Sequence, residues 1–342
     1  MSKNLLNLCK KIGLFKLDES KKVLYGPYGQ AILLEIKNLW LKSILNKNEN
    51  IYLINQRSVD ADYYVESLMS QFNKNLTTFG LIDVHDSENE MMFVDDNEAN
   101  YKYNFNFHQF LMEKDKYNDK LVYWSHQRKM FWFKLFSMPE NIALNVNDYQ
   151  MKLNYKYEAE GVEKCLEKIS CFSNDEFKKY MDERPLPSSF LSKMRLNFEK
   201  LISIQTNSEL ILESLLIDSI RTRILSGKKV FHLDFRIAPY KACVLVKSSS
   251  NESQQISNDL LNSLFKANIN VFRHEYRDDE QLEELFERFD ELGIPFIILL
   301  PVDLKKNGIC YLRNRDTTIQ EHLHFTQLID QFKFLMASFD EI

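Results

Sequence analysis

The sequence predicts an α+β fold in which two unlike domains follow one another along a chain of 342 residues. Its last third alternates short apolar runs with amphipathic segments, the pattern of an α/β domain with a mostly parallel five-stranded sheet. The first two thirds mix strands and helices without that alternation, which favours an antiparallel sheet. We therefore expect one domain over residues 1–230 and a second over residues 231–342.

The elements of the second domain follow from periodicity. Apolar runs of strand length predict strands at residues 241–247, 269–272, 296–300, 309–313 and 319–323. Apolar residues at three- and four-residue spacing predict helices at residues 256–265, 282–292 and about 326–337. Gly293 ends the middle helix, and Asp316–Thr318 forms the turn of a hairpin between the last two strands.

The first domain is less regular. Apolar stripes predict helices at residues 5–12, 32–44 and 129–136. The segment Tyr101–Phe107 alternates strictly between aromatic and polar residues, which is typical of an antiparallel strand with one exposed face. Leu121–Trp124 is a further strand candidate. Cys165 and Cys171 fall in a segment that looks helical.

Charge and apolar content exclude several classes of protein. No run of about 18 consecutive apolar residues occurs, so we expect no membrane span. The net charge of -5 is uneven, because 12 Lys and Arg stand against 18 Asp and Glu from Phe231 onward, while the first 230 residues are almost neutral. General electrostatic attraction of nucleic acid to the second domain is therefore not expected.

The sequence lacks the residue patterns of common catalytic and cofactor-binding sites. The chain has only 8 Gly, no Gly-x-Gly-x-x-Gly, and Thr222 where a phosphate loop ending at Gly227–Lys228 needs glycine. The five cysteines are scattered, and neither Cys165 with Cys171 nor His322 with His324 has the paired spacing of a zinc site. We expect no catalytic residue, no cofactor and no metal.

One polar cluster is dense enough for a binding role. Arg313-Asn-Arg315-Asp-Thr-Thr318 combines turn-forming residues with two arginines. These residues either bind a partner or fix the hairpin through hydrogen bonds to Asp and to the backbone, and the sequence leaves both possibilities open.

Several motifs carry a resemblance to a known family. Ile237-Ala-Pro-Tyr-Lys241, Asp290-Glu-Leu-Gly-Ile-Pro295 and Tyr311-Leu-Arg-Asn-Arg-Asp-Thr-Thr318 together resemble the anticodon-binding domain of class II aminoacyl-tRNA synthetases, glycyl type. Upstream, Tyr25-Gly-Pro-Tyr-Gly-Gln30 looks like the start of a glycyl-type catalytic domain. The resemblance implies a degenerate synthetase-like first domain followed by an anticodon-binding-like second domain.

The departures from a synthetase concern its ATP site. Motifs 2 and 3 of class II enzymes each carry an arginine, and motif 3 is rich in glycine. Neither motif is intact here. The segment at the position of motif 3, about Ser208–Arg223, has no glycine, so backbone cannot approach ATP closely, and Arg221 and Arg223 come too late to substitute. We therefore expect a protein that is not an enzyme.

The chain is similar to one family with this architecture and a decayed active site, the accessory (beta) subunits of mitochondrial DNA polymerase gamma. The resemblance implies a processivity subunit that binds the catalytic subunit and strengthens primer-template DNA binding, with the second domain as the main contact surface. Partner-contact candidates are Ile256, Leu260, Arg313 and Arg315. Candidates for weak or indirect DNA contact are Lys114, Lys116, Lys120, Arg128 and Lys129.

The resemblance also bears on assembly and location. Only Asp60–Asn75 lies where vertebrate members carry a helical dimerisation insertion, so we expect the insect type, a monomer that forms a one-to-one heterodimer. The family implies the mitochondrial matrix and its nucleoids. Leu5–Lys11 matches the first helix of the folded domain, so we expect this lysine-containing start to be mature structure. The alternatives are a divergent glycyl-type synthetase and a tRNA-binding module.

Overall fold

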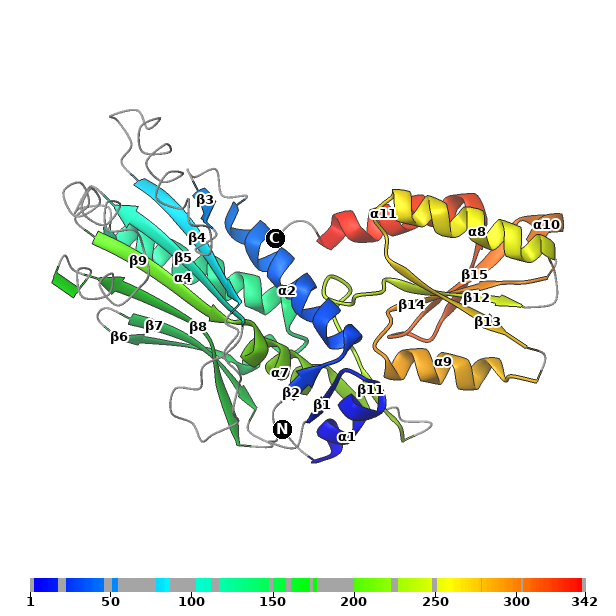
Figure 1. Cartoon of the computed structure of the whole chain (residues 1–342), viewed down its shortest axis with the longest axis horizontal. Coiled ribbons are helices and arrows are strands. Elements are labelled where there is room, and N and C mark those ends of the chain that lie inside the picture. Colours follow the sequence, from blue (N-terminus) through cyan, green and yellow to red (C-terminus); the bar gives the residue numbers. More distant parts are fainter. Residues whose placement is uncertain are drawn as a thin grey trace. The chain divides into compact units, whose positions relative to one another are not determined.

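A computed structural model gives the structure of the chain (Figure 1). It describes residues 3–17, 23–45, 51–54, 78–86, 103–111, 117–147, 150–157, 161–172, 175–176, 200–222, 227–247, 251–277, 279–302 and 304–339. These form two compact units. One contains residues 1–16, 25–39 and 215–342, and the other contains residues 17–24 and 40–214. This division differs from the predicted boundary at residue 230, because two N-terminal segments belong with the C-terminal part.

The unit formed mainly by residues 40–214 is built on a seven-stranded sheet with the order β3-β4-β5-β9-β8-β7-β6. The strands are β3 (Ile51–Ile54), β4 (Thr78–Asp86), β5 (Tyr103–Leu111), β6 (Ile142–Asn147), β7 (Gln150–Tyr157), β8 (Val162–Phe172) and β9 (Lys200–Asn207). All neighbouring pairs are antiparallel except β3 with β4, which is parallel. The predicted antiparallel sheet is thus confirmed.

Helices cover one face of this sheet. The indole of Trp40 in α2 (Pro27–Leu45) donates hydrogen bonds to Glu167 of β8 and Thr206 of β9. The indole of Trp124 in α4 (Tyr117–Leu135) donates to Gln109 of β5 at 2.6 Å. Because side chains alternate along a strand, the face with Glu167, Thr206 and Gln109 is the one that α2 and α4 cover.

Three details of this unit differ from the sequence prediction. Leu121–Trp124 is not a strand but belongs to α4, whose buried residues recur at helical spacing. The alternation of Tyr101–Phe107 predicts a half-exposed strand, yet β5 lies inside the sheet and buries Asn106 as well as Phe105. Cys165 and Cys171 lie on β8 and not on a helix.

The other unit contains the predicted five-stranded sheet, in the order β13-β12-β14-β15-β16. The strands are β12 (Ala242–Lys247), β13 (Val271–Tyr276), β14 (Phe296–Leu300), β15 (Ile309–Asn314) and β16 (Gln320–His324). Strand β12 pairs in parallel with β13 and β14, while β14–β15 and β15–β16 are antiparallel. The sheet is therefore mixed rather than mostly parallel, because the hairpin supplies two of its four pairings.

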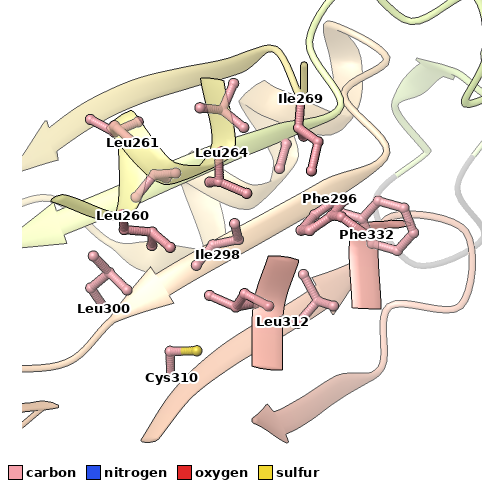
Figure 2. Close-up of a cluster of buried hydrophobic side chains, with 14 of the residues drawn as sticks. Leu260, Leu261, Leu264, Ile269, Phe296, Ile298, Leu300, Cys310, Leu312 and Phe332 are labelled. Atoms are coloured by element: carbon pink, nitrogen blue, oxygen red, sulfur yellow. The ribbon is translucent and has the colours of Figure 1, made fainter. Parts of the chain in front are cut away.

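Helices cover both faces of the five-stranded sheet. Figure 1 shows α8 (Asn251–Lys266) and α11 (Leu328–Phe339) on one side and α9 (Leu282–Glu291) on the other. Figure 2 shows Leu260, Leu261 and Leu264 of α8 packed with Ile298 and Leu312 of the sheet. The alternate residues of β12 and β14, Cys243, Leu245 and Ile297, pack against α9 instead. This two-sided burial explains the uninterrupted apolar sequences of these strands.

The same unit holds several shorter elements: α1 (Lys3–Lys11), the end of α7 (Ser208–Ser219), α10 (Leu304–Asn307) and the turn η4 (Phe325–Gln327). It also holds a two-stranded sheet, in which β10 (Ile220–Thr222) pairs with β11 (Lys229–Phe231). The turn η2 (Pro139–Asn141) lies in the other unit. A two-stranded sheet joins β1 (Phe15–Leu17) and β2 (Val23–Tyr25). The N-terminal residues of the unit contact its C-terminal part directly. The hydroxyl of Tyr28 donates to the carbonyl of Leu292 at 2.6 Å, and its ring stacks on Tyr240.

Candidate functional site

The hairpin of β15 and β16 contains a cluster of polar side chains that are hydrogen-bonded to one another and to backbone. The Asn314 side chain accepts hydrogen bonds from the backbone N–H groups of Asp316 and Thr317. Thr318 has a φ of 60°, a left-handed conformation, and its N–H donates to the carbonyl of Asn314 at 2.8 Å. The side chains from Asp316 to His322 are exposed, and Ile319 is 59% exposed. The turn thus presents a defined, uncovered tip.

The first arginine of the cluster holds this hairpin to α9. Arg313 donates two hydrogen bonds of 3.0 Å to the two carboxylate oxygens of Asp290, and both side chains are almost completely buried. The guanidinium also lies over the Phe286 ring, 4.9 Å from its centroid. Arg313 therefore supports the fold of the domain, the second of the two possibilities that the sequence left open.

The second arginine binds backbone on two other segments. Arg315 donates to the carbonyls of Gly293 and Leu233 at 2.8 and 2.9 Å, and to the Asp316 carboxylate at 2.7 Å. Asp316 also contacts the ring of His232 at 3.0 Å. Burial on its own would raise the pKa of Asp316, but His232 and Arg315 outweigh it and hold the pKa well below its usual range.

The two candidates on α8 face the core. Leu260 is buried among the apolar side chains of α8, α11 and the sheet, and Ile256 packs against the same cluster. The outer surface of this helix is formed by other residues, and Phe265 at its end is 51% exposed. Partner contact at this helix stays a prediction. Because Ile256 and Leu260 pack in the core, α8 would contact a partner through the other side chains on its outer surface.

Of the five DNA-contact candidates, the structure describes three, and Lys114 and Lys116 lie outside the described residues. The ammonium of Lys120 lies 5.4 Å from the ring centroid of Tyr123, and that of Lys129 lies 4.9 Å from the ring centroid of Phe133. Both lysines are half-buried along α4.

Arg128 has a different environment from these lysines. Its side chain is 1% exposed, and its Nε and Nη2 donate to the Glu167 carboxylate at 2.8 to 3.1 Å. Nη1 donates to the Ser43 hydroxyl, and Trp40 and Thr206 donate to the same carboxylate. A side chain enclosed in this way cannot reach DNA, so the expectation for Arg128 is corrected to a structural role. Sequence reasoning missed Glu167 because its partner lies 39 residues away.

The segment at the position of a synthetase's third motif forms the continuation of β9 into α7. Asn207 accepts a hydrogen bond from the N–H of Leu210 and caps the helix. Within α7 even Ser214 and Asp218 are buried. Arg221 lies beyond the helix, in β10, and donates to the carbonyls of Asp218 and Ile220. Arg223 lies outside the described residues.

Metal-binding clusters and membrane spans are absent from the described residues. No group of three or more His, Cys, Asp or Glu side chains there is arranged to hold a metal ion. None of the helices in the described ranges is both long and apolar enough to cross a bilayer.

Comparison with known proteins agrees with the motifs of the second domain. Residues 241–335 match a family model described as an anticodon binding domain. The DNA polymerase subunit gamma-2 of Mus musculus is 33% identical over 113 residues, and that of Bos taurus is 34% identical over 106 residues. These alignments cover 32% and 30% of this chain, and 25% and 22% of the relatives, so the matched segment spans about a quarter of their length.

A second group of relatives consists of enzymes. The glycine--tRNA ligase of Bifidobacterium longum (strain NCC 2705) is 30% identical over 103 residues, which is 30% of this chain and 20% of the ligase. Together, the topology and the family match describe a chain that combines helices, antiparallel sheets and an anticodon-binding domain. These similarities fit an accessory subunit of DNA polymerase gamma that is related to class II synthetases, as the resemblance in the sequence predicts.

Proposed function

We propose that the chain is a non-catalytic accessory subunit of mitochondrial DNA polymerase gamma. In this role it binds the catalytic subunit, strengthens primer-template binding and raises processivity during replication of mitochondrial DNA. The similarity to gamma-2 subunits of mouse and cattle supports this role, and the Xenopus laevis relative is named as mitochondrial. We place the protein in the matrix, at the nucleoid.

The observation that carries the proposal is the glycine-free segment around α7. A synthetase needs close backbone approach to ATP there, and glycine permits such approach. This chain instead has a capped helix that buries Ile211, Leu212 and Leu215. A buried, capped helix at the position of the third synthetase motif leaves no ATP site there. It supports the proposal that the fold is kept for binding a partner.

The partner surface that we propose is the anticodon-binding-like domain, at the hairpin tip and the outer side of α8. Arg313 and Arg315 act there by holding the hairpin rigid, so that the exposed residues from Asp316 to His322 keep one conformation. The net charge of -6 from residue 231 onward, 12 Lys and Arg against 18 Asp and Glu, suits a protein partner better than tRNA.

Primer extension tests the proposal directly. The full chain is added to the cognate catalytic subunit on a long primed template, and product length is compared with and without it. We expect longer products and a lower Kd of the polymerase for primer-template, while the chain alone extends nothing. Unchanged product length at saturating concentration, together with no co-purification, would contradict the proposal.

The matches to glycine--tRNA ligases favour one alternative, a divergent glycyl-type synthetase. That enzyme would catalyse glycine-dependent exchange of pyrophosphate into ATP, and we expect none. A tRNA-binding module, the remaining alternative, would bind tRNA more tightly than primer-template DNA at the same salt concentration. We expect no such preference.

We further propose that residues 1–230 have a degenerate class II synthetase-like layout and that residues 231–342 supply the partner-binding domain. The stretch predicted as a single helix, Asp60–Asn75, lies outside the described residues. Its short length supports a monomer that joins the catalytic subunit one to one. Sedimentation at micromolar concentration checks this, and a stable homodimer would contradict it.

A further inference from the structure

One face of the seven-stranded sheet carries a row of polar side chains across four neighbouring strands. Gln205 of β9 is opposite Lys168 of β8, Lys168 is opposite Lys152 of β7, and Lys152 is opposite Asn145 of β6. Directly opposed residues point to the same face of a sheet. We call these four residues the polar row. Asn106 of β5 continues it inward, where it is buried.

This row lies on the face away from α2 and α4. Glu167 and Thr206, the chain neighbours of Lys168 and Gln205, bind Trp40 and therefore face the helices. Alternation along β8 and β9 turns Lys168 and Gln205 to the opposite side. Lys152 and Asn145 are exposed there, while Lys168 and Gln205 are half-buried.

The two lysines of the row form an unfavourable pair unless an anion lies between them. Opposed residues have Cβ atoms about 4.5–5.5 Å apart, and like charges at that position destabilise a sheet. Other lysines on the same strands have acidic partners, Lys156 with Glu163 at 3.5 Å and Lys164 with Glu213 at 3.7 Å. Across the part of the chain that the structure describes, Lys152 and Lys168 have no such carboxylate.

Cys165 lies within the electrostatic field of both lysines. Burial is the main cause that raises the pKa of its thiol; Lys152 and Lys168 lower this pKa, while Glu167 and Glu163 raise it further. Both lysines, which are directly opposed in the sheet, therefore act on one site, a thiol that is half-buried while the four other cysteines are buried. The thiol can report on anything that binds between the lysines.

An unsatisfied acceptor lies beside this site. Asn154 is opposite Cys165 on β7, and its amide nitrogen donates to Glu163 at 2.8 Å. Its amide oxygen is buried and, among the described residues, has no hydrogen-bond partner. A buried acceptor without a donor costs free energy, so a ligand that supplies a donor would be favoured here. Two cations beside one acceptor suit a ligand that combines an anion with a hydroxyl or amine, as a nucleotide unit does.

We propose that the polar row binds the phosphate backbone of a nucleic-acid strand, with Lys152 and Lys168 on either side of one phosphate. From Gln205 to Asn145 the row spans about 14 Å, given a strand spacing of about 4.8 Å. That length exceeds one nucleotide, since phosphates of one strand of a duplex are about 3.4 Å apart along the axis. The amide of the exposed Asn145 provides a hydrogen-bond donor at one end of it.

The test measures binding of a fluorescent single-stranded oligonucleotide to the full chain by anisotropy, over a range of salt concentrations. The variant carries Lys152→Ala and Lys168→Ala, and the control carries Lys156→Ala, which removes a paired lysine from the same strand β7. We expect the affinity of the double variant to fall about tenfold or more. Its plot of log K against log salt should become shallower by about 0.7 for each phosphate that the variant no longer binds. The control should stay within about twofold.

A second readout uses Cys165. Alkylation of this thiol should be slowed by the oligonucleotide in the parent chain and not in the double variant. Removing two opposed cations relieves repulsion, so the double variant should unfold at the same or a higher denaturant concentration, which a separate measurement verifies. Equal affinity of parent and double variant would overturn the proposal. Protection of Cys165 by free ATP but not by the oligonucleotide would overturn it in favour of a mononucleotide site.

The proposal would give the accessory subunit a DNA contact of its own, and it deepens the proposed function without depending on the polymerase. If the chain binds DNA through these lysines but does not lengthen primer-extension products, only the proposed function fails. If it lengthens products and the double variant does so equally while its DNA affinity is unchanged, only the polar row fails.

Discussion

The Arg313 guanidinium and the Asp290 carboxylate face each other in the interior, joined by two hydrogen bonds of 3.0 Å. Arg313 lies on β15 and Asp290 in the last turn of α9, so the pair connects the helix that precedes β14 to the strand that pairs with β14. Paired geometry of this kind fixes direction as well as distance. The exposed hairpin tip is therefore oriented by a bond that no partner can reach.

Removing Arg313 should destabilise the protein strongly. Arg313→Ala leaves the Asp290 carboxylate buried without its cation, and breaking a buried pair in this way costs about 3–5 kcal/mol. Denaturant unfolding measures the decrease. The control Arg277→Ala removes an exposed arginine and should change the free energy of unfolding by less than about 0.5 kcal/mol. Equal effects of the two changes would contradict the assignment.

Arg128→Ala should likewise reduce the free energy of unfolding, by about 3–5 kcal/mol, because Glu167 would keep its charge in the interior with only neutral donors. Lys129→Ala, at the neighbouring and less buried position of α4, should change stability little. A folded Arg128→Ala protein with parental stability and weaker DNA binding would restore the original DNA-contact expectation.

Two glycines with the same backbone conformation should respond differently to alanine. Gly13 and Gly293 have φ of 69° and 77°, so either change costs about 1–2 kcal/mol of left-handed strain. A Cβ on Gly13 meets open space, whereas one on Gly293 lies 3.0 Å from the Leu233 side chain and 3.2 Å from that of Phe231. Thermal unfolding should rank Gly293→Ala as the less stable variant. The reverse order would show that packing around Gly293 relaxes without cost.

Asp316 should make stability depend on pH at the acidic end. Its pKa is lower in the folded chain than in the unfolded chain, so its ionised form stabilises the fold above the unfolded value of about 3.9. This contribution disappears as the pH falls below that value toward the folded pKa. Asp316→Asn should therefore be less stable than the parent near pH 6, with a difference that shrinks below about pH 4. Asp259→Asn, at an exposed site on α8, should show no such trend.

The second domain was predictable almost element by element. Its strands are short apolar runs and its helices carry clear stripes, so local periodicity decides the structure. Strand β14 and helices α8 and α9 appear where the sequence predicts them. Burial on both faces of the sheet leaves the same uninterrupted apolar signature in its central strands β12 and β14.

The first domain was harder to predict because long-range contacts decide it. The stripe of α4 is interrupted by Arg128, a charged residue that only the distant Glu167 makes acceptable in the interior. Without that knowledge, Leu121–Trp124 resembles an isolated strand. Strand β8 has a register irregularity opposite Leu153 and Asn154, which breaks the alternation around Cys165 and imitates helical spacing.

The roles of the two hairpin arginines, Arg313 and Arg315, could not be predicted from the local sequence. Two arginines in a turn are compatible with partner binding and with internal support, and local sequence cannot distinguish the two uses. Besides the neighbouring Asp316, the partners of Arg315 are the backbone carbonyls of residues 233 and 293, and a backbone carbonyl does not depend on which side chain its residue carries. Three-dimensional proximity alone reveals them.

The association of residues 1–16 and 25–39 with residues 215–342 has a consequence for biosynthesis. A ribosome releases residues 1–16 and 25–39 well before it makes Tyr240, Glu291 and Leu292, the partners of Lys11 and Tyr28. Until then the buried face of α1 and the start of α2 have no matching surface. The nascent chain must keep these helices uncommitted while the 264 positions that separate Tyr28 from Leu292 are synthesised, a period in which their apolar surface is exposed to aggregation.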